Sequence, residues 1–286
     1  MSSRSPAAPG SAQDRGARRR DRRPFWKEVV RGEVPLESYH VPDELPPLER
    51  FENAAKLVRH FKTAHYPTRR LWLTFLMRAL DLSPGARVLE VGPGCGFLAY
   101  EMCRRGYDYT GYDMVPQNEE MWRVTSRFYG LDGKVVVADI CEAEGPPFFD
   151  AIFSLSTFEH IHDQPRAIRR CYELLRPGGR FVVFDGNILD PRMWWRQVVM
   201  RPIRSGGRQG GLKWVFGKGT VYEDYGLGWR GKEEDVKSIF WWRRQLRAAG
   251  FDVVTVLTSG YFRPALRALG LWPFAGTVLA VAEKPR

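Results

Sequence analysis

The sequence predicts an α/β fold, a doubly wound and mostly parallel seven-stranded sheet with helices on both faces. Two observations carry this prediction. From residue 86 onward, short apolar strands alternate with helical segments, and the first strand runs into a loop with glycines at three alternate positions. Such alternation places parallel strands side by side, with crossover helices packed on the faces of the sheet. A hydrophobic share of 44% in 286 residues is enough to fill a core of that kind.

Two segments precede the alternating region. Residues 1–23 are rich in Arg, Ser, Ala, Gly and Pro, and we expect a disordered basic tail there, in preference to an organellar transit peptide. Residues 24–81 are expected to form an N-terminal helical lid segment, with helices at about 48–63 and 68–80. The second helix is indicated by Leu71, Phe75, Leu76 and Leu80 at helical spacing.

Residues 82–286 are expected to form the sheet domain. Its seven predicted strands are Arg87–Val91, Tyr107–Asp113, Lys134–Ile140, Asp150–Leu155, Arg180–Asp185, Phe251–Thr258 and Gly276–Ala282. The helices predicted between them are Gly96–Arg105, Asn118–Tyr129, one capped by Asp163 with Pro165 in its first turn, and about 233–249. A Gly-, Trp- and Arg-rich insertion at 186–232 follows the fifth strand.

The net charge of +11 is concentrated in two places. Residues 1–23 hold seven Arg and two Asp, and residues 190–232 hold nine Lys or Arg and three Asp or Glu. A nucleic-acid enzyme more often spreads its basic residues over a folded face, so this distribution argues against a nucleic-acid partner. The four cysteines are dispersed without metal-ligand spacing, and no apolar run reaches membrane-spanning length. These observations predict a cytoplasmic protein with reduced thiols and no bound metal.

The carboxyl ends of the first three strands form the predicted ligand site, as is usual in open parallel sheets. The spacing Gly92-x-Gly94-x-Gly96 departs from the dinucleotide fingerprint G-x-G-x-x-G. Asp113 ends the second strand, where a carboxylate can accept hydrogen bonds from ribose hydroxyls, and Asp139 could accept from an adenine amine. Glu90 could attract an ammonium group. With no Lys or Arg for phosphates in these motifs, S-adenosylmethionine fits the site better than a dinucleotide does.

The chain resembles the class I S-adenosylmethionine-dependent methyltransferases, especially the small-molecule branch of the type 11/12-like domains. The resemblance covers about residues 86–185 and rests on five motifs in order: Val88–Gly96, Tyr112–Met114, Ala138–Ile140, Phe149–Ser154 and Leu174–Arg180. It implies a Rossmann-like fold. It also implies a set of cofactor-binding residues, namely Glu90, Gly92, Pro93, Gly94, Cys95, Gly96, Asp113, Met114, Asp139, Ile140 and Ser154.

The end of the fourth strand faces the methyl group in this family, by resemblance. An alcohol or phenol acceptor must lose a proton there, and a histidine that titrates near neutrality suits that task. His160 is the first candidate base, and Glu159 and His162 are second choices. Two other interpretations remain open: His160 caps a helix or bonds the backbone, or Glu159, His160 and Asp163 hold a divalent ion.

The acceptor is expected to be a small molecule, with the methyl group going to a hydroxyl oxygen of a sugar-, lipid- or secondary-metabolite-type substrate. Trp and Arg in the insertion suit an anionic, glycosylated or lipid-linked acceptor. The insertion could also lie on a membrane surface through an amphipathic helix with Met193, Trp194, Trp195, Val198 and Val199. Alternatives are an RNA methyltransferase, a non-catalytic cofactor-binding module and a nicotinamide-dependent oxidoreductase, which the glycine spacing disfavours.

Overall fold

The structure is a computed structural model that describes residues 24–200, 202–203, 221–223, 230–232 and 235–286. The expected disordered tail at 1–23 and much of the insertion at 186–232 lie outside the described residues. The chain divides into two units, Met1–Pro35 and Leu36–Arg286. The described part of the first unit holds one helix, α2 (Phe25–Arg31), which ends at Gly32 in the left-handed conformation.

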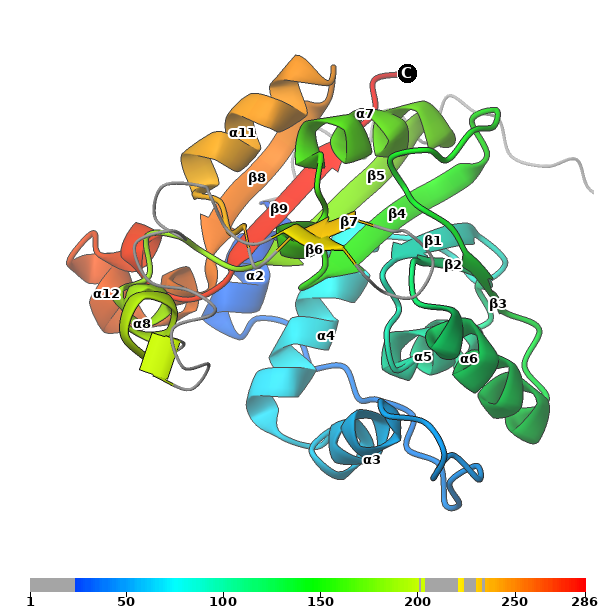
Figure 1. Ribbon diagram of the computed structural model, residues 1–286. Coiled ribbons are helices and arrows are strands. Elements are labelled where there is room, and N and C mark those ends of the chain that lie inside the picture. The colour runs from blue at the N-terminus through cyan, green and yellow to red at the C-terminus, as the bar shows by residue number, and fades with distance from the viewer. Residues whose placement is uncertain (1–23, 201, 204–220, 224–229, 233–234) are drawn as a thin grey trace, which may run out of the picture. The chain divides into compact units, whose positions relative to one another are not determined.

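The second unit is built on a seven-stranded sheet (Figure 1). Its order is β3-β2-β1-β4-β5-β9-β8, and β9 runs antiparallel to both of its neighbours while the other pairings are parallel. The strands are β1 (Arg87–Val91), β2 (Asp108–Asp113), β3 (Lys134–Val137), β4 (Phe149–Leu155), β5 (Leu175–Asp185), β8 (Asp252–Thr258) and β9 (Val278–Glu283). The predicted fold class is therefore confirmed.

Helices cover both faces of this sheet (Figure 1). One face carries α7 (Gln164–Leu174) and α11 (Ile239–Ala248); the other carries α4 (Pro67–Leu80), α5 (Phe97–Arg104) and α6 (Pro116–Tyr129). The helix α3 (Ala54–Lys62) packs on α5. The remaining described elements are η1 (Phe158–His160), α8 (Pro191–Trp194), η2 (Trp195–Met200), the hairpin β6 (Val221–Glu223) and β7 (Arg230–Lys232), η3 (Ser259–Phe262), α12 (Pro264–Ala268) and η4 (Trp272–Phe274).

Several element boundaries differ from the predictions, and β5 begins at Leu175, five residues before the predicted Arg180. The helix expected at 48–63 begins at Ala54, because the preceding residues form turns whose backbone bonds reach back only three residues, as from Phe51 N–H to the Leu48 carbonyl. The strand expected over Lys134–Ile140 ends at Val137. Helix α11 begins at Ile239, where the Ser238 side chain accepts from the backbone N–H of Trp241.

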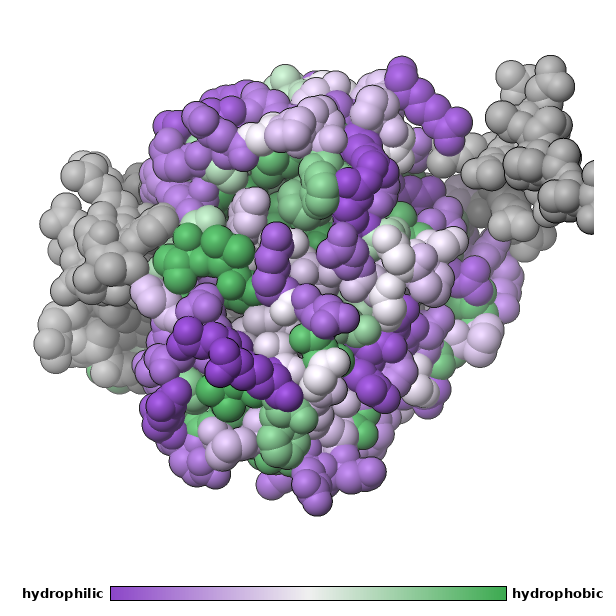
Figure 2. Space-filling model, turned by 90° about the vertical axis from the view of Figure 1, so that its right-hand side faces the viewer, coloured by the Kyte–Doolittle hydropathy of each residue, from purple (hydrophilic) through white to green (hydrophobic). Residues whose placement is uncertain are grey.

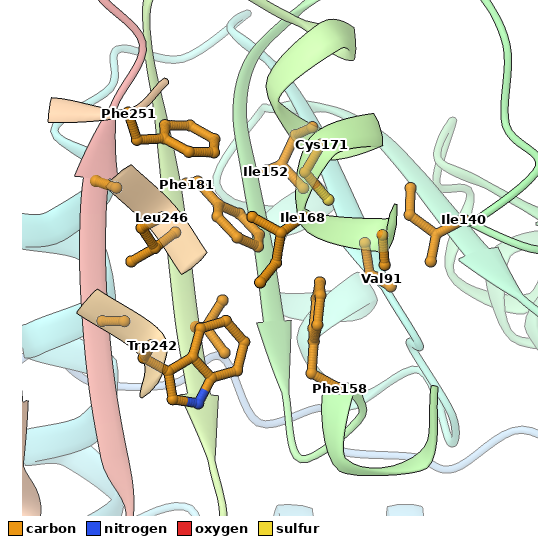
Figure 3. Packing of buried hydrophobic residues seen from close by; sticks show 14 of the residues in the cluster. Val91, Ile140, Ile152, Phe158, Ile168, Cys171, Phe181, Trp242, Leu246 and Phe251 are labelled. Carbon is orange, nitrogen blue, oxygen red and sulfur yellow. The ribbon is translucent and has the colours of Figure 1, made fainter. Parts of the chain in front are cut away.

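The apolar core between the sheet and helices α7 and α11 is rich in aromatic side chains (Figure 3). Phe158 packs between Trp242 and Phe181, with ring centroids 5.4 and 5.6 Å away, and Phe181 stacks on Phe251 at 5.6 Å. All four side chains are buried. Since Phe158 opens the turn η1, this packing anchors the segment that carries the candidate base.

At the end of the sheet opposite β8, the edge strand is β3. Figure 2 shows the side of the molecule to the right in Figure 1, where hydrophilic residues are interspersed with small apolar patches. Val136 of β3 is 39% exposed. This edge therefore offers no broad apolar surface in that view, and the features that position a ligand lie at the carboxyl ends of the strands.

Candidate functional site

A cavity of about 520 Å³ opens at the carboxyl ends of β1, β2 and β4. We call it the glycine-loop cavity. Its volume lies within the range of small-molecule sites. The residues that line it are Glu52, Asn53, Lys56, His60, Val91, Gly92, Pro93, Gly94, Cys95, Tyr112, Asp113, Met114, Val115, Gln117, Asn118, Ala138, Ile140, Leu155, Ser156, Thr157, His160 and Ile161.

The glycines of the loop are required by its backbone. Gly92, Gly94 and Gly96 have φ values of 76°, 54° and 76°, in the left-handed region that side chains disfavour. A Cβ on Gly92 would lie 2.3 Å from the side chain of Thr157, so this glycine allows β1 and the segment after β4 to approach closely. Nothing in the described structure lies within 4 Å of a Cβ placed on Gly94, which leaves its backbone open at the cavity.

Asp113 links the glycine loop to the end of β2. Its Oδ2 accepts from the backbone N–H of Gly94 at 2.9 Å and from Nδ2 of Asn118 at 3.0 Å, and its Oδ1 accepts from Val115 N–H at 2.9 Å. Burial raises the pKa of the carboxyl, and these three hydrogen bonds oppose the rise. An acceptor of this kind, held on the cavity wall, fits the ribose of S-adenosylmethionine.

Glu90, which is expected to attract an ammonium group, is not among the residues that line the cavity. The side chain is buried, and its Oε2 accepts from the hydroxyl of Tyr109 at 2.7 Å. Burial raises the pKa of Glu90 to about 8, which the Tyr109 bond opposes and the charge of Asp113 supports. The carboxyl therefore holds a proton at neutral pH, and a neutral group cannot attract an ammonium group by charge.

Asp139 and Ser154 are also absent from the cavity lining. The Oδ1 of Asp139 accepts from the backbone N–H of Cys141 at 2.8 Å, which forms a local turn after β3. Ser154 is buried and donates to the carbonyl of Val91 at 2.9 Å, so it joins β4 to β1. Its role in this structure is to hold two strands together.

The other predicted cofactor residues lie together at the cavity. Pro93, Cys95, Met114 and Ile140 line it alongside Asp113 and two of the glycines. Gly96 stands just beyond, as the residue that precedes α5. Ile140 supplies apolar surface at the wall where β3 has ended, which suits the face of a purine ring.

Two residues of α3, Lys56 and His60, also line the cavity, although neither belongs to a predicted motif. Lys56 lines it, so the expectation of a site without a nearby cation is wrong. His60 stacks on Phe97 with ring centroids 5.0 Å apart, and its Nδ1 lies 2.5 Å from Nη1 of Arg69. Burial and the positive charge of Arg69 lower the pKa of His60 to about 4. The ring is therefore neutral near pH 7. The signal that could have found both residues is their shared helical face, four residues apart.

Of the three candidate bases, only His160 is among the residues that line the cavity. His160 lines the cavity with a side chain that is 43% exposed. Glu159 is buried behind it, with Oε1 at 3.9 Å from Nε2 of His160, and its backbone N–H donates to Oδ1 of Asp185 at 3.4 Å. His162 lies outside the cavity lining. Burial and the charge of Glu159 raise the pKa of Asp185 well above its usual range.

The described part of the insertion begins with a tight helical segment. Asp190 caps α8 and also accepts from the backbone N–H of Gly276 at 2.7 Å, which ties the segment to the turn before β9. Trp194 and Trp195 are 40% and 61% exposed. No helix among the described residues is long and apolar enough to cross a membrane.

Comparisons with known proteins agree with this geometry. A family model described as a methyltransferase domain matches residues 63–256. The ubiquinone biosynthesis O-methyltransferase of Xanthomonas euvesicatoria pv. vesicatoria (strain 85-10) is 36% identical over 117 residues, which are 40% of this chain and 48% of that protein. The protein of the same name from Proteus mirabilis (strain HI4320) is 30% identical over 169 residues, 57% of this chain and 68% of that protein. The chain spans about half the length of the first of these curated relatives.

Solved structures share the fold at low identity. Phosphoethanolamine N-methyltransferase 2 of Haemonchus contortus, in complex with S-adenosyl-L-methionine, has a TM-score of 0.51 and 18% identity, and the match covers 75% of this chain and 52% of that one. The [4+2]-cyclase SpnF has a TM-score of 0.52 and 17% identity, with coverage of 92% and 94%. The fold thus hosts more than one chemistry, and the family model decides membership. With its sheet order, its glycine loop and the match over 63–256, the chain belongs to the class I S-adenosylmethionine-dependent methyltransferase family.

Proposed function

We propose that this chain transfers the methyl group of S-adenosylmethionine to a hydroxyl oxygen of a small-molecule acceptor, of the sugar, lipid or secondary-metabolite type. The observation that carries the proposal is that Asp113 and His160 line one cavity, from the ends of two different strands, with the glycine loop between them. The names of the curated relatives support oxygen as the methyl acceptor.

The residues present fit the cofactor. When bound, S-adenosylmethionine supplies a methyl carbon already activated by a sulfonium. The loop Gly92–Gly96 would lie against it with exposed backbone, Asp113 would accept from the ribose hydroxyls, and Met114 and Ile140 would pack on the adenine. Asn118 keeps the Asp113 carboxylate oriented through its 3.0 Å bond.

His160 would act as the base. A neutral imidazole can take the hydroxyl proton of the acceptor as that oxygen bonds to the methyl carbon. The Oε1 of Glu159, at 3.9 Å from Nε2, would stabilise the imidazolium that forms. The anchoring of Phe158 in the aromatic core limits how far this turn can move, which favours alignment of acceptor and methyl group.

An aromatic-lined cavity beside the site supports an acceptor with an apolar part. It measures about 240 Å³ and is lined by Thr68, Leu71, Trp72, Phe75, Ser259, Phe262 and Arg263. The ring of Phe184 lies 5.3 Å from Trp72, and Phe184 pairs in register with Leu155, which lines the glycine-loop cavity. An acceptor could therefore present its hydroxyl to the glycine-loop cavity and its apolar portion to this second cavity.

The exposed Trp194 and Trp195, with Arg192 and Arg196 in the same short segment, support peripheral contact with an anionic lipid surface. A lipid-linked acceptor would be reached most directly from such a surface. Liposome sedimentation with the Trp195→Ala variant tests this part of the proposal, and equal sedimentation of variant and wild type would contradict it.

The proposed chemistry is tested first by transfer of labelled methyl from S-adenosylmethionine into a cell extract, with the product identified by mass. On that acceptor, His160→Ala should lower kcat by about 10²–10⁴-fold. Its affinity for S-adenosylhomocysteine, measured by calorimetry, should stay within about twofold of wild type. The exposed His65 gives a matched control, since His65→Ala should leave kcat unchanged.

Asp113→Asn gives the complementary result. It removes the charge while keeping one oxygen, so affinity for S-adenosylhomocysteine should fall at least about tenfold, the value of one charge-assisted hydrogen bond. Unchanged kcat in His160→Ala would refute the role of the base. Binding of NAD in preference to S-adenosylhomocysteine would refute the proposed methyl donor.

A further inference from the structure

Three metal-ligating side chains come together in residues that adjoin the lining of the glycine-loop cavity in sequence. A carboxylate oxygen of Asp139, Sγ of Cys141 and a ring nitrogen of His162 all lie within 4.8 Å of one another. The first two come from the turn after β3, and the third comes from the residue before the α7 cap. Among the described residues, this is the one group of three or more such side chains that could hold an ion.

The chemistry of this donor set selects a class of cation. One oxygen, one sulfur and one nitrogen suit a borderline divalent ion such as Zn²⁺, whereas Mg²⁺ and Ca²⁺ require oxygen ligands. Tetrahedral ligands at about 2.0–2.3 Å from Zn²⁺ lie about 3.5 Å from one another. The observed group therefore needs to contract by about 1 Å, which side-chain rotations supply.

The surroundings hold these donors in place. The Asp139 carboxylate accepts from the backbone N–H of Cys141 at 2.8 Å, and the thiol lies 3.5 Å from the carbonyl of Asp163. The side chain of Cys141 is fully buried. The Nδ1 of His162 is buried and has no hydrogen-bond partner among the described residues. A buried ring nitrogen without a partner is unfavourable, and a metal ion would satisfy it.

The position of the group relative to the cavity is also defined. Each of the three residues adjoins in sequence a residue that lines the cavity, namely Ala138, Ile140 or Ile161. None of the three candidate ligands is itself among the residues that line the cavity. A metal bound there would fix the turn that carries Ile140.

We propose that Asp139, Cys141 and His162 form a binding site for Zn²⁺ or a similar borderline divalent cation, with three protein ligands and a fourth position for water. This site is separate from the proposed methyl-transfer site and does not depend on that activity. The sequence predicts no bound metal because its cysteines lack metal-ligand spacing along the chain. The fold, however, brings these three ligands together from separate segments.

The test is titration of the purified full chain with Co²⁺, followed by absorption spectroscopy. Wild type should bind one equivalent and show the cobalt–thiolate charge-transfer band with intense tetrahedral ligand-field bands, and Zn²⁺ should displace it. Cys141→Ser should lose the thiolate band. The matched control Cys103→Ser changes a cysteine outside the group and should retain it.

A second variant keeps the thiol and covers the case in which Cys141→Ser fails to fold. His162→Ala should weaken Co²⁺ binding at least about tenfold, while His65→Ala should bind as wild type does. The proposal is overturned if wild type shows no thiolate band at saturating Co²⁺. It is also overturned if His162→Ala binds with wild-type affinity. Neither readout uses S-adenosylmethionine, so failure of methyl transfer would not affect the result.

Discussion

The buried carboxyl of Glu90 makes the stability of this protein depend on pH in a way that one substitution should remove. Glu90→Gln replaces the carboxyl by a neutral group of nearly the same shape. The amide oxygen can still accept from Tyr109, whose hydroxyl donates to Glu90 at 2.7 Å. The substitution therefore preserves packing and the hydrogen bond, and removes the titration.

The magnitude follows from the raised pKa. Burial moves the pKa of Glu90 from 4.5 to about 8, so between these values the folded state holds a proton that the unfolded chain releases. The stability that protonated Glu90 contributes is fully present below pH 4.5 and is lost as the pH rises toward 8. Integrating over this window, wild type should lose about 3–4 kcal/mol between pH 5 and pH 8 that Glu90→Gln does not lose.

The assay is urea unfolding of wild type and variant at both pH values, without cofactor. The two proteins should differ little at pH 5, and the variant should be more stable by about 3–4 kcal/mol at pH 8. The exposed Glu49 provides the control, because Glu49→Gln should change stability by less than about 0.5 kcal/mol at either pH. If the difference between wild type and Glu90→Gln were the same at pH 5 and pH 8, the carboxyl would not be protonated in the folded state, and the reasoning would fail.

Two further predictions concern the loop and its support. Gly92→Ala places a Cβ 2.3 Å from the Thr157 side chain at a φ of 76° and should lower the free energy of unfolding by about 2–5 kcal/mol. Gly130→Ala, with open space around its Cβ, should lower it by only about 1 kcal/mol. Urea denaturation of the two variants distinguishes these outcomes. Arg105→Ala should cost about 3–5 kcal/mol because the buried carboxylate of Glu101 loses its ion pair with Arg105 Nε at 2.6 Å and keeps only its contacts with His40. The exposed neighbour Arg104 provides the control. A loss of stability as large in Arg104→Ala as in Arg105→Ala would contradict this account.

Much of the fold and half of the site could be predicted from the sequence, because those features are encoded locally. A strand followed by three alternating glycines favours this turn, since glycine adopts the left-handed φ values of Gly92, Gly94 and Gly96 more readily than any other residue. The carboxyl end of β2 must lie beside that of β1 in a parallel pair, which places Asp113 at the loop. The order of strands and helices likewise follows from the periodicity of apolar residues.

Tertiary structure alone decided which of the predicted side chains face the cavity. Glu90 and Asp139 are as acidic as Asp113 in the sequence, but the carboxyl of Glu90 accepts from Tyr109, that of Asp139 accepts from the Cys141 backbone, and neither residue lines the cavity. The same packing brings Lys56 to the cavity from a helix more than 30 residues before the loop. Such contacts depend on how separate elements meet, and the pattern within one element does not contain that information. The sequence by itself therefore determined the fold and the loop, and packing between elements determined the chemistry of the walls.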